Sequence, residues 1–154
     1  MSIPWPARSV LAGAAGTAAL TLAYCAERRL RPLHEGPLDY DDSLVPGQIV
    51  ASIMRLPELT ASEYQNLGTA LRWGYGPVFG VAHGLLQRRV GGPAAGFVFG
   101  AALVGATLTL FPLLGDTPPP WHWPADVIAT CLATHAAYAI TVVRVEDSLR
   151  RIGR

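Results

Sequence analysis

The sequence of 154 residues contains no lysine, only two cysteines and few charges of either sign. Charged residues make up 15% of the chain, whereas soluble domains average about a quarter. The formal net charge of +1 provides no field that would attract nucleic acid, so no nucleic-acid partner is expected. Because all twelve basic residues are arginines and alanine, glycine and proline are abundant, the composition indicates a GC-rich, bacterial coding sequence.

Recognisable catalytic and metal-binding motifs are also missing. The chain has no P-loop, nucleophile elbow, dinucleotide fingerprint or metalloprotease helix, so we expect a protein that is not an enzyme and has no cofactor. Cys25 and Cys131 lie in apolar runs without a CxxC or Cys/His spacing, and are interpreted as packing residues. One acidic stretch does not match the calcium-loop spacing and is interpreted as a solvated loop without a metal: His34, Glu35, Asp39, Asp41 and Asp42.

Long apolar runs are what the sequence does have. Half of the residues are hydrophobic and the mean hydropathy is +0.30. Four runs approach the roughly 20 residues that a membrane-spanning helix needs. They predict an all-α integral membrane bundle of four transmembrane helices in a single domain, 1–154, with spans at approximately 9–26, 67–86, 93–114 and 125–143. The first run also resembles a signal peptide, but its length and the charged stop at Glu27–Arg31 favour a retained span.

The polar loop 27–66 separates the first two predicted spans. Within it Ile49, Val50, Ile53 and Leu56 recur at helical spacing and predict a short interfacial helix that ends by Pro57. Thr60–Glu63 matches a capping box, which predicts that the second membrane helix begins near Ala61. Inside that helix Arg72 is flanked by aromatic residues, so its side chain is expected to extend to the lipid headgroups.

Small residues recur every fourth position in the predicted spans. A glycine inside a helix costs about 1 kcal/mol relative to alanine in water. Membrane helices, however, associate by close packing through small residues. This glycine-zipper pattern therefore predicts tight packing between helices of the chain or between copies of it. The residues concerned are Gly76, Gly80 and Gly84, then Gly92, Gly96 and Gly100, and finally Ala129, Ala133 and Ala137.

The arginine distribution predicts an orientation. Cytoplasmic termini would place seven arginines inside and four outside, which agrees with the positive-inside rule, although the cluster Arg28–Arg31 argues against it. We therefore expect a multi-pass protein of the bacterial cytoplasmic (inner) membrane with both termini in the cytoplasm.

Two histidines fall inside predicted spans, where ionisable groups are expensive and often functional. His83 and His135, with Tyr138 on the same helix face as His135, are candidates for a proton relay. The alternative is that both are neutral histidines hydrogen-bonded across helices. Their depths differ by about 7 Å at the rise of an α-helix, which argues against two axial ligands of one haem.

One segment resembles a known family. RWGYGPVFGVAHGLL (72–86) is similar to the signature of the YagU-like inner membrane proteins and their actinobacterial relatives, where His-Trp-Gly-Tyr-Gly runs into Gly-x-x-Tyr-Gly-Leu-Leu. Pro118–Trp121 and His135–Tyr138 resemble the proline-rich loop and closing His-x-x-Tyr-Gly helix of that family, over roughly residues 39–143. Arg72, His83 and Ala139 replace the family's histidine, tyrosine and glycine. The resemblance implies a small inner membrane protein and no particular activity.

These observations favour a non-enzymatic accessory or envelope-maintenance protein that acts through helix packing. Its expected partners are the lipid bilayer and either a second copy of the chain or another membrane protein. Two alternatives remain open: a minor transporter or proton-conducting protein that uses His83, His135 and Tyr138, and a carrier of haem or quinone.

Overall fold

The computed structural model describes residues 3–30, 43–115 and 117–152, and within these ranges the chain is helical with no strand. Its elements are α1 (Trp5–Leu30), α2 (Val45–Ile53), α3 (Ala61–Arg89), α4 (Gly92–Leu114), the short 3₁₀ helix η1 (Pro120–His122) and α5 (Ala125–Ile152). The all-α prediction is therefore confirmed for the described part of the chain.

Three of the helices, α1, α4 and α5, are long and apolar enough to cross a membrane. The protein is accordingly a membrane protein by helix length and composition. Helix α3 has 29 residues and is also long enough, but its hydropathy is lower because it contains Arg72, His83 and several polar residues in its first turns. The helices extend beyond the predicted spans, most of all α5, which continues nine residues past Val143.

The start of α3 agrees with the predicted capping box. The Thr60 hydroxyl accepts a hydrogen bond from the Glu63 backbone N–H, and the Glu63 carboxylate accepts one from the Thr60 backbone N–H at 2.7 Å. The bond from this backbone N–H holds the pKa of Glu63 below its usual range. Helix α3 ends at Arg89, and Gly91 and Gly92, both with positive φ, form the turn into α4.

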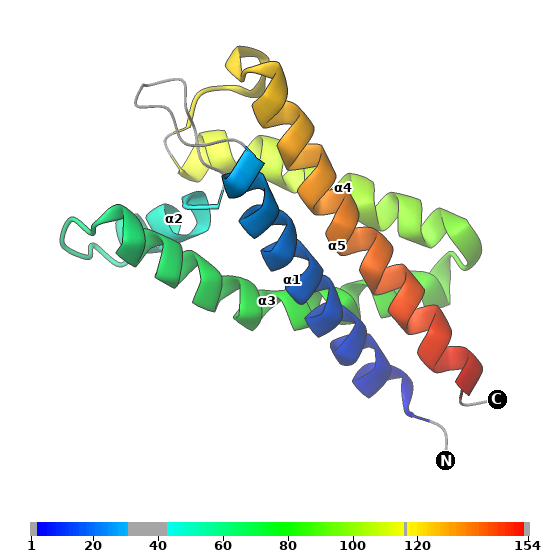
Figure 1. Cartoon of the computed structure of the whole chain (residues 1–154). Coiled ribbons are helices and arrows are strands. Elements are labelled where there is room, and N and C mark those ends of the chain that lie inside the picture. The colour runs from blue at the N-terminus through cyan, green and yellow to red at the C-terminus, as the bar shows by residue number, and fades with distance from the viewer. Residues whose placement is uncertain (1–2, 31–42, 116, 153–154) are drawn as a thin grey trace.

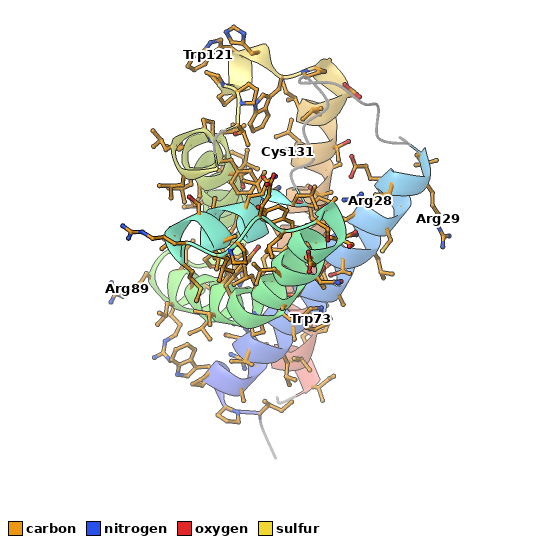
Figure 2. The ribbon with its side chains drawn as sticks, turned by 90° about the vertical axis from the view of Figure 1, so that its left-hand side faces the viewer. Arg28, Arg29, Trp73, Arg89, Trp121 and Cys131 are labelled. Carbon is orange, nitrogen blue, oxygen red and sulfur yellow. The ribbon has the colours of Figure 1, made fainter. Side chains whose placement is uncertain are left out.

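Figure 1 shows the arrangement of the helices: α1 packs against both α3 and α5, whereas α4 contacts mainly α5. The two chain termini and the α3–α4 turn lie towards one end, and the guanidinium of Arg88 stacks over the Trp5 ring there at 4.8 Å. Helix α2 and the α4–α5 connection, which carries Trp121, lie towards the other end (Figures 1 and 2). A short helix, α2, is present in the first loop and packs against α3, but it ends at Ile53 and so does not include Leu56.

The buried core is small, and its larger cluster lies between α1, α4 and α5. This cluster contains seven buried residues: Ala12, Leu20, Tyr24, Phe99, Tyr138, Ala139 and Val142. A second, smaller cluster is formed by Trp123, Val127 and Cys131. Many large apolar side chains point outwards instead, including Phe97 at 79% and Leu113 at 72% exposure. Helix α4 has the highest hydropathy of the three candidate spans and the smallest buried share. An apolar outer surface of this kind suits lipid as the surrounding solvent.

Candidate functional site

Three glycines of α3, namely Gly76, Gly80 and Gly84, lie where this helix contacts α1. A methyl group added at Gly80 would overlap the Ser9 carbonyl and lie 2.6 Å from the Gly13 Cα atom. A methyl group at Gly76 would overlap the Thr17 hydroxyl. Because backbone meets backbone at Gly80, the two helices can approach this closely only with glycine there.

The other small residues have different surroundings. An added Cβ at Gly96 would lie 2.9 Å from the Val143 side chain, and one at Gly100 would lie 3.5 Å from Ala139. These two contacts join α4 to α5 through side chains rather than through backbone. Gly92 has open space around it and serves the turn through its φ of +57°.

Within the described chain, the alanines of α5 do not form the predicted packing face. Ala129 and Ala133 are exposed and Ala137 is only half-buried. Helix α5 turns larger residues inwards, and Tyr138 and Val142 pack onto Gly16 of α1, where a Cβ would meet them at 2.8 and 2.6 Å. The small residue of this interface therefore lies on α1, and the bulky residues lie on α5.

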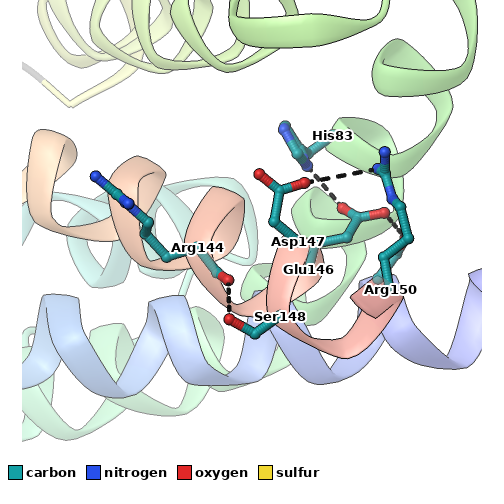
Figure 3. Close-up of polar contacts among 7 residues, drawn as sticks. His83, Arg144, Glu146, Asp147, Ser148 and Arg150 are labelled. Carbon is teal, nitrogen blue, oxygen red and sulfur yellow. Dashed lines mark hydrogen bonds and ion pairs between the residues drawn. The ribbon is translucent and has the colours of Figure 1, made fainter. Parts of the chain in front are cut away.

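A buried polar network joins three helices near the end where the termini lie. His83 of α3 and Glu146 of α5 are each only 2% exposed, and His83 Nδ1 lies 2.7 Å from Glu146 Oε2. The hydroxyl of Ser9, on α1, donates to Glu146 Oε1 at 3.0 Å. Gly84 makes room for this pair of contacts, since a Cβ there would overlap the Ser9 hydroxyl and lie 3.4 Å from Glu146 Oε1. Figure 3 shows His83 reaching the Glu146 carboxylate from the neighbouring helix.

Sequence reasoning missed Glu146, which lies beyond the predicted end of the fourth span. It is surrounded in sequence by Arg144, Asp147 and Arg150, and so resembles part of a polar tail. The signal that could have found it is helical spacing, because Tyr138, Val142 and Glu146 follow each other at intervals of four and share the inward face of α5.

His135 and Tyr138 form separate cross-links. His135 Nδ1 lies 2.8 Å from the Cys131 carbonyl and must donate to it. In the neutral imidazole, Nε2 therefore accepts the hydrogen bond from the Thr107 hydroxyl of α4 at 2.8 Å. The Tyr138 hydroxyl donates to the Gly76 carbonyl of α3 at 2.6 Å. Each of the two side chains thus ties α5 to another helix.

The three residues predicted as a proton relay are not joined by hydrogen bonds in the described structure. The ring of Phe99 contacts both His83 and Tyr138, at centroid distances of 5.1 and 6.1 Å. This geometry favours the alternative interpretation of the histidines as partners in bonds across helices.

No group of three or more metal-ligating side chains is present among the described residues. The acidic stretch at 34–42 lies outside them. Neither cysteine forms a disulfide; Cys25 is exposed and Cys131 is buried.

Arg72 is placed differently from the prediction. Its side chain does not extend outwards but is 4% exposed, with the guanidinium over the Tyr24 ring at 4.8 Å and Nη2 donating to the Thr69 hydroxyl at 3.0 Å. The cause is helical spacing: Arg72 lies four residues from both Gly68 and Gly76 and so shares the inward face of α3.

No protein-family model matches the chain, and no curated protein and no solved structure matches it. Its function is therefore inferred from the contacts described above.

Proposed function

We propose that this chain is a four-span protein of the bacterial cytoplasmic membrane that acts as a non-enzymatic accessory or envelope-maintenance protein, through helix packing with a second copy or another membrane protein. The resemblance to the YagU-like proteins supports this location. The proposal has three parts, which are the fourth span, the orientation and the mode of action.

The fourth span is α3, and its support is the distribution of its side chains. The buried residues of α3 are the polar or small ones, among them Arg72 and His83, whereas Trp73, Val78, Phe79 and Leu85 are exposed. A helix that buries its polar side chains and exposes its apolar ones is suited to a lipid environment, although its mean hydropathy is low.

The orientation with cytoplasmic termini is supported by the clustering of arginines at one end. The end that holds the termini and the α3–α4 turn carries Arg8, Arg88, Arg89, Arg144, Arg150 and Arg151. The opposite end carries Arg28 and Arg29 on α1 and Arg55 after α2. The excess of arginine therefore lies on the side of the termini.

The single observation that supports a non-catalytic mode of action is that the polar side chains inside the bundle form hydrogen bonds between helices. His83, Glu146, His135 and Tyr138 all form hydrogen bonds to other helices, and these bonds join α5 to α1, α3 and α4. Such bonds hold a bundle in one arrangement, which is what a protein that works by presenting fixed helix faces requires.

The mode of action is tested by determining the mass of the purified protein in a mild detergent and in nanodiscs, by light scattering with the detergent or lipid contribution subtracted. We expect a homo-oligomer or a stoichiometric complex with another membrane protein. A strictly monomeric chain without a co-purifying protein would count against packing as its function.

A further inference from the structure

We propose that the cavity around Arg72 is a binding site for one acyl-chain lipid, which Arg72 holds by an anionic headgroup. The site lies at the meeting point of all five α-helices. This inference depends on the membrane location of the chain but not on its partner.

The cavity has the size and shape of an acyl-chain site. Its volume is about 300 Å³, at the lower end of the range of roughly 300–1,000 Å³ for small-molecule pockets. One wall is a single face of α4 from Leu103 to Leu114, a length of about 16 Å at the rise of an α-helix. An elongated apolar cavity of this kind matches a hydrocarbon chain better than a compact polar solute.

The cavity is open towards the surroundings of the bundle. Among its lining residues Phe79 is 39%, Leu110 47% and Leu114 52% exposed. These residues belong to α3 and α4, which make few contacts with each other. A lipid could therefore enter sideways between the two helices.

Arg72 supplies the charge in the cavity. Its Nε and Nη1 atoms are buried and have no hydrogen-bond partner among the described residues. An arginine keeps its proton in a protein, and buried N–H groups of a guanidinium that lack an acceptor are unfavourable, even though Nη2 donates to Thr69 and the ring of Tyr24 lies against the charge. Hydrogen bonds to an anion would remove this penalty, and guanidinium groups bind carboxylates and phosphates well.

The remaining lining argues for a lipid rather than a soluble anion. No carboxylate lines the cavity within the described chain, so the positive charge of Arg72 is not neutralised there. The polar lining residues Thr107, His135 and Tyr138 already bond across helices, and most of the others are apolar. An inorganic anion would make no contact with this apolar surface, whereas the acyl chain of a lipid would cover it.

The test uses the full-length protein, delipidated in an uncharged detergent, and cis-parinaric acid as a fluorescent fatty-acid probe. We expect one probe molecule per chain, displaced by oleate and by lysophosphatidic acid. Oleyl alcohol should compete about tenfold or more weakly, because it lacks the charge that Arg72 binds. Equal competition by oleyl alcohol and oleate would overturn the proposal, and displacement by butyrate or inorganic phosphate would show a site for small anions instead.

Variants locate the site. Arg72→Gln should weaken oleate binding about tenfold or more and leave oleyl alcohol unaffected, while Arg72→Lys should weaken oleate binding less. The matched control is Arg89→Gln, at an exposed arginine of the same helix. Ala106→Trp should fill the cavity and abolish probe binding, whereas Ala102→Trp, one turn away on α4 and outside the lining, should not. If Arg72→Gln fails to fold, unchanged probe binding in the Ala106→Trp variant would still refute the proposal.

Discussion

His83 Nδ1 lies 2.7 Å from Glu146 Oε2, although 63 residues separate the two in sequence. The contact joins α3 to α5, and the Ser9 hydroxyl on the same carboxylate adds α1. Three helices are thus held together by one buried acid. A carboxylate at such a position is expensive unless it is hydrogen-bonded, so we interpret Glu146 as the residue that fixes the relative positions of these helices.

The first prediction concerns this acid. Glu146→Ala should lower the free energy of unfolding by about 1–3 kcal/mol, because it leaves the buried polar groups of His83 and Ser9 without their partner. Thermal unfolding in detergent, followed by circular dichroism, measures the change. Glu146→Gln retains an acceptor and should lose less, and Asp147→Ala, at a half-buried neighbour with a 3.9 Å contact to Arg150, should change little. Equal stability of the Glu146→Ala variant and the wild-type protein would show that the network contributes nothing.

The second prediction concerns the contact between α1 and α3. Gly80→Ala should destabilise the bundle, because its methyl group would overlap the Ser9 carbonyl and the backbone of Gly13. Gly74→Ala is the matched control on the same helix, where an added methyl group meets nothing within 4 Å. It should be neutral or stabilising by up to about 1 kcal/mol through helix propensity. The same detergent unfolding assay compares the two, and a reversed order would contradict the packing described for Gly80.

The third prediction concerns the membrane path of α3. In a chain with Cys25→Ser and Cys131→Ala, single cysteines are introduced at Glu58, Val78 and Val90 and treated in intact cells with a membrane-impermeant maleimide. Glu58→Cys should be labelled in intact cells, and Val90→Cys should be labelled only after the membrane is permeabilised. Val78→Cys should be labelled in neither condition, because lipid surrounds it. Labelling of Val78→Cys in intact cells would exclude α3 as a span.

The fourth prediction concerns proton conduction. His135 has both ring nitrogens engaged, and Phe99 stands between His83 and Tyr138. Liposomes containing the protein and a pH-sensitive dye should therefore show no proton flux above that of empty liposomes. A flux that disappeared in His135→Ala would instead establish the proton-conducting alternative.

The helices could be predicted from the sequence because apolar runs and caps are local signals. The start of α3 and the short helix of the first loop follow from Thr60–Glu63 and from the spacing of a few apolar residues. The inward faces could not be read from hydropathy alone, since in a membrane the outer surface is as apolar as the core.

Three features of the bundle show what hydropathy misses. The aromatic neighbours of Arg72 favour a place at the lipid headgroups, but its glycine neighbours at intervals of four turn it inwards. Glu146 is not found by its hydropathy, because the apolar run of α5 ends before it, although the helix continues. For α5, alanine spacing suggests a packing face, yet the bulky residues Tyr138 and Val142 occupy that interface, because Gly16 of α1 leaves space for them.

The measurement that tests the account most directly is the partition of the protein after cell lysis. Membranes are collected by centrifugation, washed with alkaline carbonate to remove peripheral proteins, and then extracted with detergent. If lipid surrounds these helices, the protein stays in the washed membrane pellet and is released only by detergent. Recovery of the folded protein in the supernatant before any detergent is added would contradict the account.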